Sequence, residues 1–248
     1  DGASVSIADS SLVFAASVSV GLTVQSGGTA IDFGDLSAQR GMTGSASSST
    51  RGIFAGGEES GGNVNTIDFI EIMTIGNAVD FGDISAAKKD SHSGLVNSPI
   101  RGVFAGGTPE PNNIIEMVNM ASTGNAVKFG DLSQGRKGFA GFGNSVRGAF
   151  AAGEAHGSPG TVTTMDYITI TSEGNAIDFG DARSSRYIIN GGVSNSTRGV
   201  WSGGATALEL IEYVNFATLG NSLDFGNLML PRRAAFGCSD SHGGLGGF

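Results

Sequence analysis

Polar and hydrophobic residues alternate along four short stretches of the chain. These stretches are IDFIEI at 67–72, IEMVNM at 115–120, MDYITI at 165–170 and IEYVNF at 211–216. Alternation with a period of two predicts a half-buried β-strand. Each stretch is followed by a Gly-Asn pair, at 76–77, 124–125, 174–175 and 220–221. Glycine and asparagine tolerate positive φ, so each pair predicts a hairpin turn into a further strand.

That further strand carries a phrase such as IDFGDL or VKFGDL, which occurs five times. Its phenylalanines are Phe33, Phe81, Phe129, Phe179 and Phe225. In four copies an acid lies two residues after the phenylalanine, at Asp35, Asp83, Asp131 and Asp181. Successive phenylalanines are 46 to 50 residues apart. A period of this length is typical of stacked or radial β repeats. We predict that each phenylalanine packs as a core residue between neighbouring units.

A second phrase, of the form Arg-Gly-x-aromatic, opens each unit. Its arginines are Arg51, Arg101, Arg147 and Arg198. We interpret this phrase as the first strand of a unit, the alternating stretch as the second and the phenylalanine phrase as the third. A fourth strand is expected through residues 138–144 in one unit and 187–195 in the next. A polar turn then leads to the following Arg-Gly.

Loop lengths separate a constant frame from a variable part. The acid of the second strand always precedes the repeat phenylalanine by 13 residues, whereas the opening aromatic precedes that acid by 11 to 16 residues. The loops between those two positions have unrelated sequences, and variable loops on a rigid frame commonly carry recognition. The candidate binding residues in these loops are Glu58, Glu59, Asn63, Asn65, Glu110, Asn112, Asn113, Glu154 and His156.

The expected fold is all-β, a five-bladed propeller of four-stranded blades. Residues 1–18 form a lead-in or spare strand, and residues 19–248 form one propeller domain. The predicted blades lie around 51–97, 98–146, 147–197 and 198–242, with a composite blade made of 243–248 and 19–50. Joining the two chain ends in this last blade removes free sheet edges. Six blades is the alternative.

The repeat resembles the kelch family of β-propeller blades. The resemblance lies in Ala105-Gly106-Gly107, the strand 115–120, Phe129, Leu132 and Arg136. Phenylalanine stands in all five copies where the kelch repeat has tryptophan, and the count of five differs from the usual six or seven. The sequence motifs GNAxDFGDL and SNSxRGVFAGG also resemble repeats in tail or appendage proteins of marine bacteriophages. This resemblance implies a role in a virion.

Composition excludes several classes of protein. Glycine contributes 42 of 248 residues without a Gly-X-Y period, which favours a turn-rich β protein over collagen. The net charge is −9 and no basic face is visible, so we expect no nucleic-acid partner. Residues 10–31, the longest uncharged stretch, alternate like strands, so we expect no membrane insertion. One cysteine, Cys238, excludes an internal disulfide and a cysteine-based zinc site.

Candidate chemistry is weighed against the repeat. Asp-Phe-Gly occurs in protein kinases, but here it recurs as a strand without a phosphate loop or a His-Arg-Asp segment. Asp32 and Asp35 lie three residues apart on a strand, which does not create a calcium cage. His92, His156 and His242 occupy unrelated repeat positions, and Trp201 takes an aromatic core position. We expect no catalytic residue, no cofactor and no metal.

Basic residues also follow the repeat. Besides the opening arginines, a second set consists of Arg40, Lys88, Arg136, Arg186 and Arg232. We predict that one or both sets pair with the repeated Asp or Glu residues as a ring of buried or half-buried ion pairs, which specify register more than they add stability. The alternative is a basic ring that binds an anionic glycan.

These patterns favour a non-enzymatic structural and recognition module of a virion, located in the virion or outside the cell. Its expected partners are other virion subunits and a host-surface glycan or receptor, contacted through the variable loops. A carbohydrate-active enzyme, a lyase or a glycosidase, is the first alternative. Enzymes of that kind need carboxylate or histidine groups that break the repeat symmetry, and here the conspicuous polar residues follow it. A purely structural assembly protein is the second alternative.

Overall fold

The computed structural model of the chain consists of β-strands, with no helix in the residues that it describes. These residues are 4–8, 18–23, 31–90, 96–110, 112–157, 160–187, 189, 191–205 and 208–233. His92, His242 and Cys238 lie outside them, as do residues 24–30 and 243–248 of the predicted composite blade and residues 234–242 of the predicted blade 198–242.

Five larger antiparallel sheets follow one another along the described chain. The first is β1 (Ser4–Ala8), β2 (Val18–Thr23) and β3 (Ile31–Asp35). The second is β4 (Gly44–Ser47), β5 (Arg51–Ala55), β8 (Thr66–Glu71) and β9 (Val79–Asp83). The third is β10 (Val96–Asn97), β11 (Arg101–Ala105), β12 (Ile114–Asn119) and β13 (Val127–Asp131). The fourth is β15 (Ala140–Gly143), β16 (Arg147–Ala151), β18 (Thr164–Thr169) and β19 (Ile177–Asp181). The fifth is β20 (Val193–Ser194), β21 (Arg198–Ser202), β22 (Leu210–Asn215) and β23 (Leu223–Asn227).

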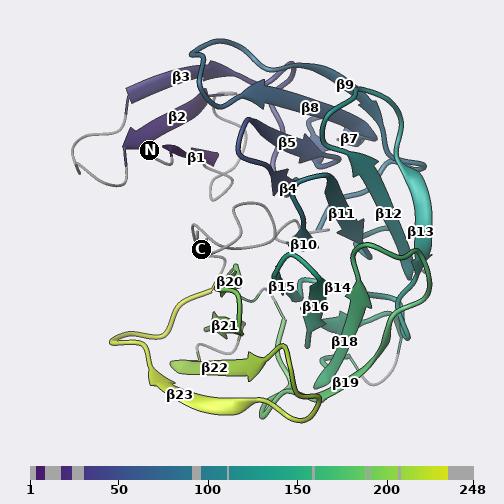
Figure 1. Cartoon of the computed structure of the whole chain (residues 1–248), viewed down its shortest axis with the longest axis vertical. Coiled ribbons are helices and arrows are strands. Elements are labelled where there is room, and N and C mark those ends of the chain that lie inside the picture. The colour runs from purple at the N-terminus through teal and green to yellow at the C-terminus, as the bar shows by residue number, and fades with distance from the viewer. Residues whose placement is uncertain are drawn as a thin grey trace.

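The sheets are arranged as in a β-propeller. In Figure 1 they follow one another around a common centre, with β4, β10 and β15 toward the centre and β9, β13 and β19 at the rim. The inner strands of neighbouring sheets contact one another. Two short pairs lie in the connections, β6 (Glu58–Glu59) with β7 (Gly62–Asn63) and β14 (Arg136–Lys137) with β17 (Glu154–Ala155). The predicted all-β class and the four-stranded sheets are therefore correct.

The limits of the sheets differ from the predicted blade limits. Each strand that was expected to end a unit instead pairs with the opening strand of the next unit, as β15 does with β16. The four complete sheets therefore begin at Gly44, Val96, Ala140 and Val193 rather than at 51, 98, 147 and 198. The reason is local, because a tight polar turn joins the two strands. In the fourth sheet Asn144 Oδ1 accepts the amide protons of Val146 and Arg147.

Four of the repeat phenylalanines lie between neighbouring sheets. Phe33, Phe81, Phe129 and Phe179 are buried, each in a cluster with side chains of the following sheet. Phe81, for example, clusters with Phe104 and Val118. Phe225 differs, since its side chain is 55% exposed at the outer strand of the last sheet. No following sheet covers it among the described residues.

The Gly-Asn pair joins neighbouring sheets instead of making the hairpin turn. The turn itself comes earlier, where the amide of Thr74 donates to Glu71 O (3.1 Å). Gly76 N then donates to Phe33 O (2.9 Å), while Asn77 Oδ1 accepts from the Asp35 amide (3.1 Å) in the preceding sheet. The same contacts recur at the next three junctions. The prediction of a Gly-Asn hairpin turn is thus wrong in its position.

This contact also explains the glycine of the Asp-Phe-Gly-Asp phrase. A Cβ at Gly82 would lie 2.5 Å from the backbone of Gly124, and one at Gly130 would lie 2.0 Å from Gly174 O. At Gly226, in the last sheet, a Cβ would meet nothing within 4 Å. The repeated acids Asp35, Asp83, Asp131 and Asp181 follow these glycines, and their backbone amides take part in the same junctions.

The first sheet follows the register of the others. β2 pairs with β3 with a bulge between Ser19 and Val20, at the position where the other sheets have a bulge beside their acid. β1 pairs with β2 as β5 pairs with β8. Part of the predicted lead-in, residues 1–18, therefore occupies the place of an opening strand.

Candidate functional site

Buried ion pairs connect each sheet to the loop that precedes it. Arg40 contacts Asp68 at 2.9 Å, Lys88 contacts Glu116 at 2.5 Å and Arg136 contacts Asp166 at 2.9 Å, and a fourth pair joins Arg186 to Glu212. All eight side chains are at most 2% exposed. The prediction of ion pairs is confirmed for these four basic residues.

Each acid of these pairs is also held by the preceding loop. Ser133 donates to Asp166 from its hydroxyl (2.7 Å) and its amide (3.3 Å), and the amide of Ser85 donates to Glu116 (2.7 Å). Burial alone would raise the pKa of Glu116. The charge of Lys88 and the hydrogen bonds from Lys88 and Ser85 outweigh burial and leave this pKa below its usual value.

Burial has the opposite result for the arginines. It lowers the pKa of Arg40, Arg136 and Arg186 below the usual value, and the neighbouring carboxylate opposes this shift in each case. Arginine stays charged over the ordinary pH range because its pKa starts so high. The four ion pairs therefore stabilise the contact between each sheet and the preceding loop, and their side chains are too buried to contact a ligand.

The fifth predicted basic residue, Arg232, differs from the others. It is exposed, and it follows the last sheet. The strand position that carries an acid in the other four sheets is Val20 in the first sheet. The predicted pairing of Arg232 with a repeated acid stays a prediction.

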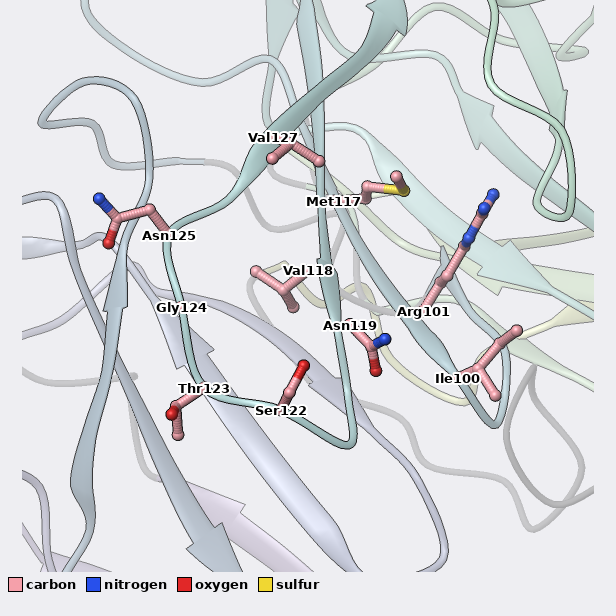
Figure 2. Close-up of a pocket in the computed structure, with 10 residues that line it drawn as sticks. All are labelled: Ile100, Arg101, Met117, Val118, Asn119, Ser122, Thr123, Gly124, Asn125 and Val127. Atoms are coloured by element: carbon pink, nitrogen blue, oxygen red, sulfur yellow. The ribbon is translucent and has the colours of Figure 1, made fainter.

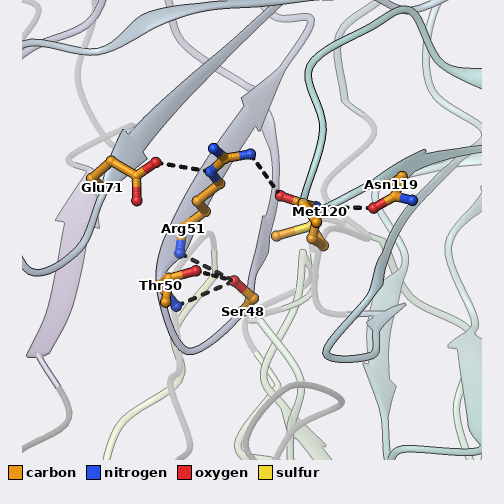
Figure 3. Close-up of polar contacts among 7 residues, drawn as sticks. Ser48, Thr50, Arg51, Glu71, Asn119 and Met120 are labelled. Carbon is orange, nitrogen blue, oxygen red and sulfur yellow. Dashed lines mark hydrogen bonds and ion pairs between the residues drawn. The ribbon is translucent and has the colours of Figure 1, made fainter.

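The opening arginines form a second link between sheets. Arg51 donates to Met120 O (3.1 Å), Arg101 to Ile170 O (2.8 Å) and Arg147 to Phe216 O, each acceptor lying just beyond the third strand of the following sheet. Figure 3 shows Arg51 between Glu71, at 2.9 Å, and this carbonyl.

Three of these guanidinium groups also lie over an aromatic ring of their own sheet. The distances to the ring centroids are 4.8 Å for Arg51 and Phe69, 5.0 Å for Arg147 and Tyr167, and 4.9 Å for Arg198 and Tyr213. Two opening arginines contact a carboxylate, Arg51 with Glu71 at 2.9 Å and Arg101 with Glu173 at 4.0 Å. Neither acid recurs in the other sheets, so these contacts differ from the predicted pairing with the repeated acids.

We call the end of the sheets that carries the variable loops the loop face. It comprises the described parts of 56–65, 106–113, 152–163 and 203–209. The loops contact one another and the connecting segments between sheets. Glu58 pairs with Lys89 at 2.6 Å, and Asn63 Nδ2 donates to Thr108 O (3.2 Å) in the next loop.

The next contact around the loop face involves His156. Its Nδ1 lies 2.6 Å from a Glu110 carboxylate oxygen and its Nε2 lies 3.2 Å from Gly107 O. Glu154 contacts Lys137 at 3.5 Å. Sequence reasoning placed the three acids and the histidine in these loops but missed their lysine partners Lys89 and Lys137, which lie in connecting segments.

The remaining predicted loop residues have mixed surroundings. Glu59 and Asn65 are half-buried and Asn113 is exposed, while Asn112 is buried, with its Oδ1 accepting from the amide of Ile114 (3.3 Å). The loop face thus presents carboxylates, amides and ammonium groups, which are suited to hydrogen bonding with a polar ligand. Trp201 is buried in the core, as predicted.

The described residues contain no group of three or more His, Cys, Asp or Glu side chains placed to hold a metal ion. Nor do they include a helix long and apolar enough to cross a membrane.

A pocket of about 390 Å³ lies at the opposite end of the third sheet from the loop face. Figure 2 shows it between Arg101, which begins β11, and the segment that joins β12 to β13. Its walls combine apolar side chains, polar side chains and one arginine. The lining residues are Ile100, Arg101, Met117, Val118, Asn119, Ser122, Thr123, Gly124, Asn125 and Val127.

Comparison with known proteins bears on the fold. Neither a protein-family model nor a curated protein sequence matches the chain. Among solved structures, that of YjhT is similar with a TM-score of 0.76 and 12% sequence identity, over 96% of this chain and 85% of that one. At this identity the similarity establishes a common fold and carries no function across. The chain therefore shares the β fold of YjhT.

Proposed function

We propose that the protein is a non-enzymatic recognition module that binds a polar ligand, a glycan or a receptor, through the loop face. One observation carries this proposal. The repeated polar residues are used in contacts between sheets, as Arg136 and Asp166 are, whereas the polar residues of the loop face differ from one sheet to the next. A frame held by its repeated residues leaves the variable loops free to evolve toward a ligand.

The finer form of the fold in this proposal is a closed five-bladed propeller. The first sheet has the register of a blade, and the last sheet carries Phe225 and Gly226 uncovered at its outer strand. Closure would bring the first sheet onto that strand and bury Phe225 as Phe81 is buried. The C-terminal residues would complete the first sheet.

The biological setting in this proposal is a virion. It rests on the resemblance of the repeat sequence to repeats in tail or appendage proteins of marine bacteriophages. The partners would be other virion subunits and a host-surface glycan or receptor. Localisation of the chain within a particle by electron microscopy with a specific antibody would test this setting. An antibody that labels no particle would refute it.

A second function, docking to a neighbouring subunit, is favoured by exposed apolar side chains. We call the end of the sheets opposite the loop face the turn end. Large apolar side chains are exposed there, including Met73 at 78%, Ile75 at 65% and Ile100 at 58%. Exposed apolar patches commonly mark protein contacts.

Binding to a glycan array beside a hydrolysis and lyase assay tests the main proposal. Retention on particular glycans, without release of new reducing ends or unsaturated sugars, is the expected result. Turnover of a bound glycan would overturn the proposal and favour the carbohydrate-active enzyme.

A further inference from the structure

The third sheet departs from a stacking arrangement that the second, fourth and fifth sheets share. In those sheets an aromatic side chain of the third strand lies under the opening arginine, with 4.8 to 5.0 Å between the guanidinium carbon and the ring centroid. The same ring meets the repeat phenylalanine edge-on, at 5.8 to 6.0 Å. The rings are Phe69, Tyr167 and Tyr213.

In the third sheet Met117 occupies the position of that ring. Met117 pairs with Val127 across the strands as Phe69 pairs with Val79, so the two positions are equivalent in register. Asn119 stands opposite Arg101, as Asn215 stands opposite Arg198 in the fifth sheet, whereas the second sheet has Glu71 opposite Arg51. The difference peculiar to the third sheet is therefore the missing ring. The guanidinium of Arg101 contacts Ile170 O at 2.8 Å and Glu173 at 4.0 Å.

The pocket of about 390 Å³ lies at this place, with Met117 and Arg101 on its wall. Figure 2 shows both side chains beside the hollow, together with Val127. The volume suffices for an aromatic ring, because an engineered apolar cavity of about 150 Å³ holds benzene. Ile100 and Val127 are 58% and 54% exposed, so the pocket opens at an apolar part of the surface.

We infer that this pocket binds an aromatic side chain, a tyrosine or phenylalanine of a partner protein that docks at the turn end. The ring lies under Arg101 and against the thioether of Met117. Guanidinium groups attract the face of an aromatic ring, and methionine sulfur makes favourable contacts with aromatic rings. Ser122 and Thr123 lie at the pocket and supply hydroxyl groups for the backbone or the phenol of the partner. The site is separate from the loop face.

Methyl NMR tests the inference on the intact chain with ¹³C-methyl methionine and isoleucine. N-acetyl-tyrosinamide serves as the side-chain probe, p-cresol as the free phenol and N-acetyl-leucinamide as the non-aromatic control. We expect a saturable upfield ring-current shift of the Met117 and Ile100 methyls with both aromatic probes, at a Kd on the order of 1 mM. The leucine probe should leave both methyls unshifted.

Two variants sharpen the test. Met117→Tyr should supply the ring from within, abolish the Ile100 shift and raise the midpoint of thermal unfolding by about 2–4 °C. Tyr167→Met should create an equivalent pocket in the fourth sheet, so the introduced methionine methyl should shift with the aromatic probes. This second variant keeps the test decisive even where Met117→Tyr does not fold.

Three outcomes would overturn the inference. They are no saturable shift with N-acetyl-tyrosinamide, an equal shift with N-acetyl-leucinamide, and binding of p-cresol alone. The last would mean that the pocket accepts free phenols but excludes a side chain attached to a backbone.

Discussion

The buried pair of Arg136 and Asp166 gives the sharpest test of how the sheets are held together. Asp166→Asn removes one charge and leaves the guanidinium of Arg136 buried beside a neutral amide. Both side chains are 0% exposed and their nearest nitrogen and oxygen lie 2.9 Å apart. Breaking a buried pair from one side costs about 3–5 kcal/mol, because the remaining charge has neither solvent nor counter-ion.

The chain contains its own control variants for this prediction. Glu71→Gln breaks the pair with Arg51, whose side chains are 21% and 47% exposed, and should cost less than about 1 kcal/mol. The double variant Arg136→Lys with Asp166→Glu reproduces the pair of Lys88 and Glu116 at the preceding junction. It should be more stable than the sum of its single variants by about 2 kcal/mol.

Equilibrium unfolding in urea provides the measurement. Trp201 is the single tryptophan of the chain and is 1% exposed, so its fluorescence reports on loss of the core. The slope of the free energy of unfolding against urea should stay constant among the variants, which confirms that stability alone changed. A cost for Asp166→Asn no larger than that of Glu71→Gln would refute the reasoning.

Three further predictions follow from the same contacts. Gly82→Ala should lower the free energy of unfolding by about 1–3 kcal/mol more than Gly226→Ala. The φ angles are similar, +144° and +142°, but an added Cβ has a neighbour within 4 Å only at Gly82. Equal losses in urea unfolding would contradict the contact between sheets. Phe81→Ala should lower the free energy of unfolding by about 3–5 kcal/mol, because Phe81 is buried. Phe225→Ala should lower it by as much if the ring of sheets is closed and by far less if the ring is open. Thermal unfolding of the two variants distinguishes these cases. The depressed pKa of Glu116 means that its stabilising contribution is present above about pH 4.5 and is lost as the pH falls through the folded-state value. The fall in stability between pH 7 and pH 3 should therefore be smaller in Glu116→Gln, and an unchanged fall would contradict the assignment.

Much of the fold could be predicted because its main elements are local. The constant spacing of 13 residues between Asp68 and Phe81 reflects one hairpin with fixed register. The buried phenylalanines and the ion pairs could be predicted because each recurs with every unit. The Gly-Asn pair was wrongly predicted to form the hairpin turn. The same two residue types suit both a turn and a backbone contact between sheets, so the sequence does not separate the two. Only the neighbouring backbone, such as Gly124 beside Gly82, distinguishes the two.

The limits of the sheets could not be taken from the period alone. A repeat has the same period wherever its first residue is placed, and the polar turn before Arg147 pairs the strand ahead of it with β16 rather than with the preceding sheet. Phe225 lies in the same Asp-Phe-Gly motif as Phe179, so its exposure could not be anticipated from that motif without the sheet that follows.

The candidate site could likewise be predicted only in part. Loop-length variation located Glu58, Glu110 and His156 on one face, but sequence gave no sign that Lys89 would reach Glu58 from another segment. Comparison of the repeats does contain a sign of the pocket. Among the four four-stranded sheets, Met117 is the non-aromatic residue at a position otherwise held by Phe69, Tyr167 and Tyr213.

The most direct test of the central claim is glycan-array binding of the wild-type chain beside two variants of matched stability. Glu110→Gln changes the loop face, whereas Glu71→Gln changes an exposed carboxylate at the turn end. The account predicts retention on particular glycans that Glu110→Gln weakens and Glu71→Gln preserves. Equal retention of all three proteins, or loss with Glu71→Gln alone, would contradict it.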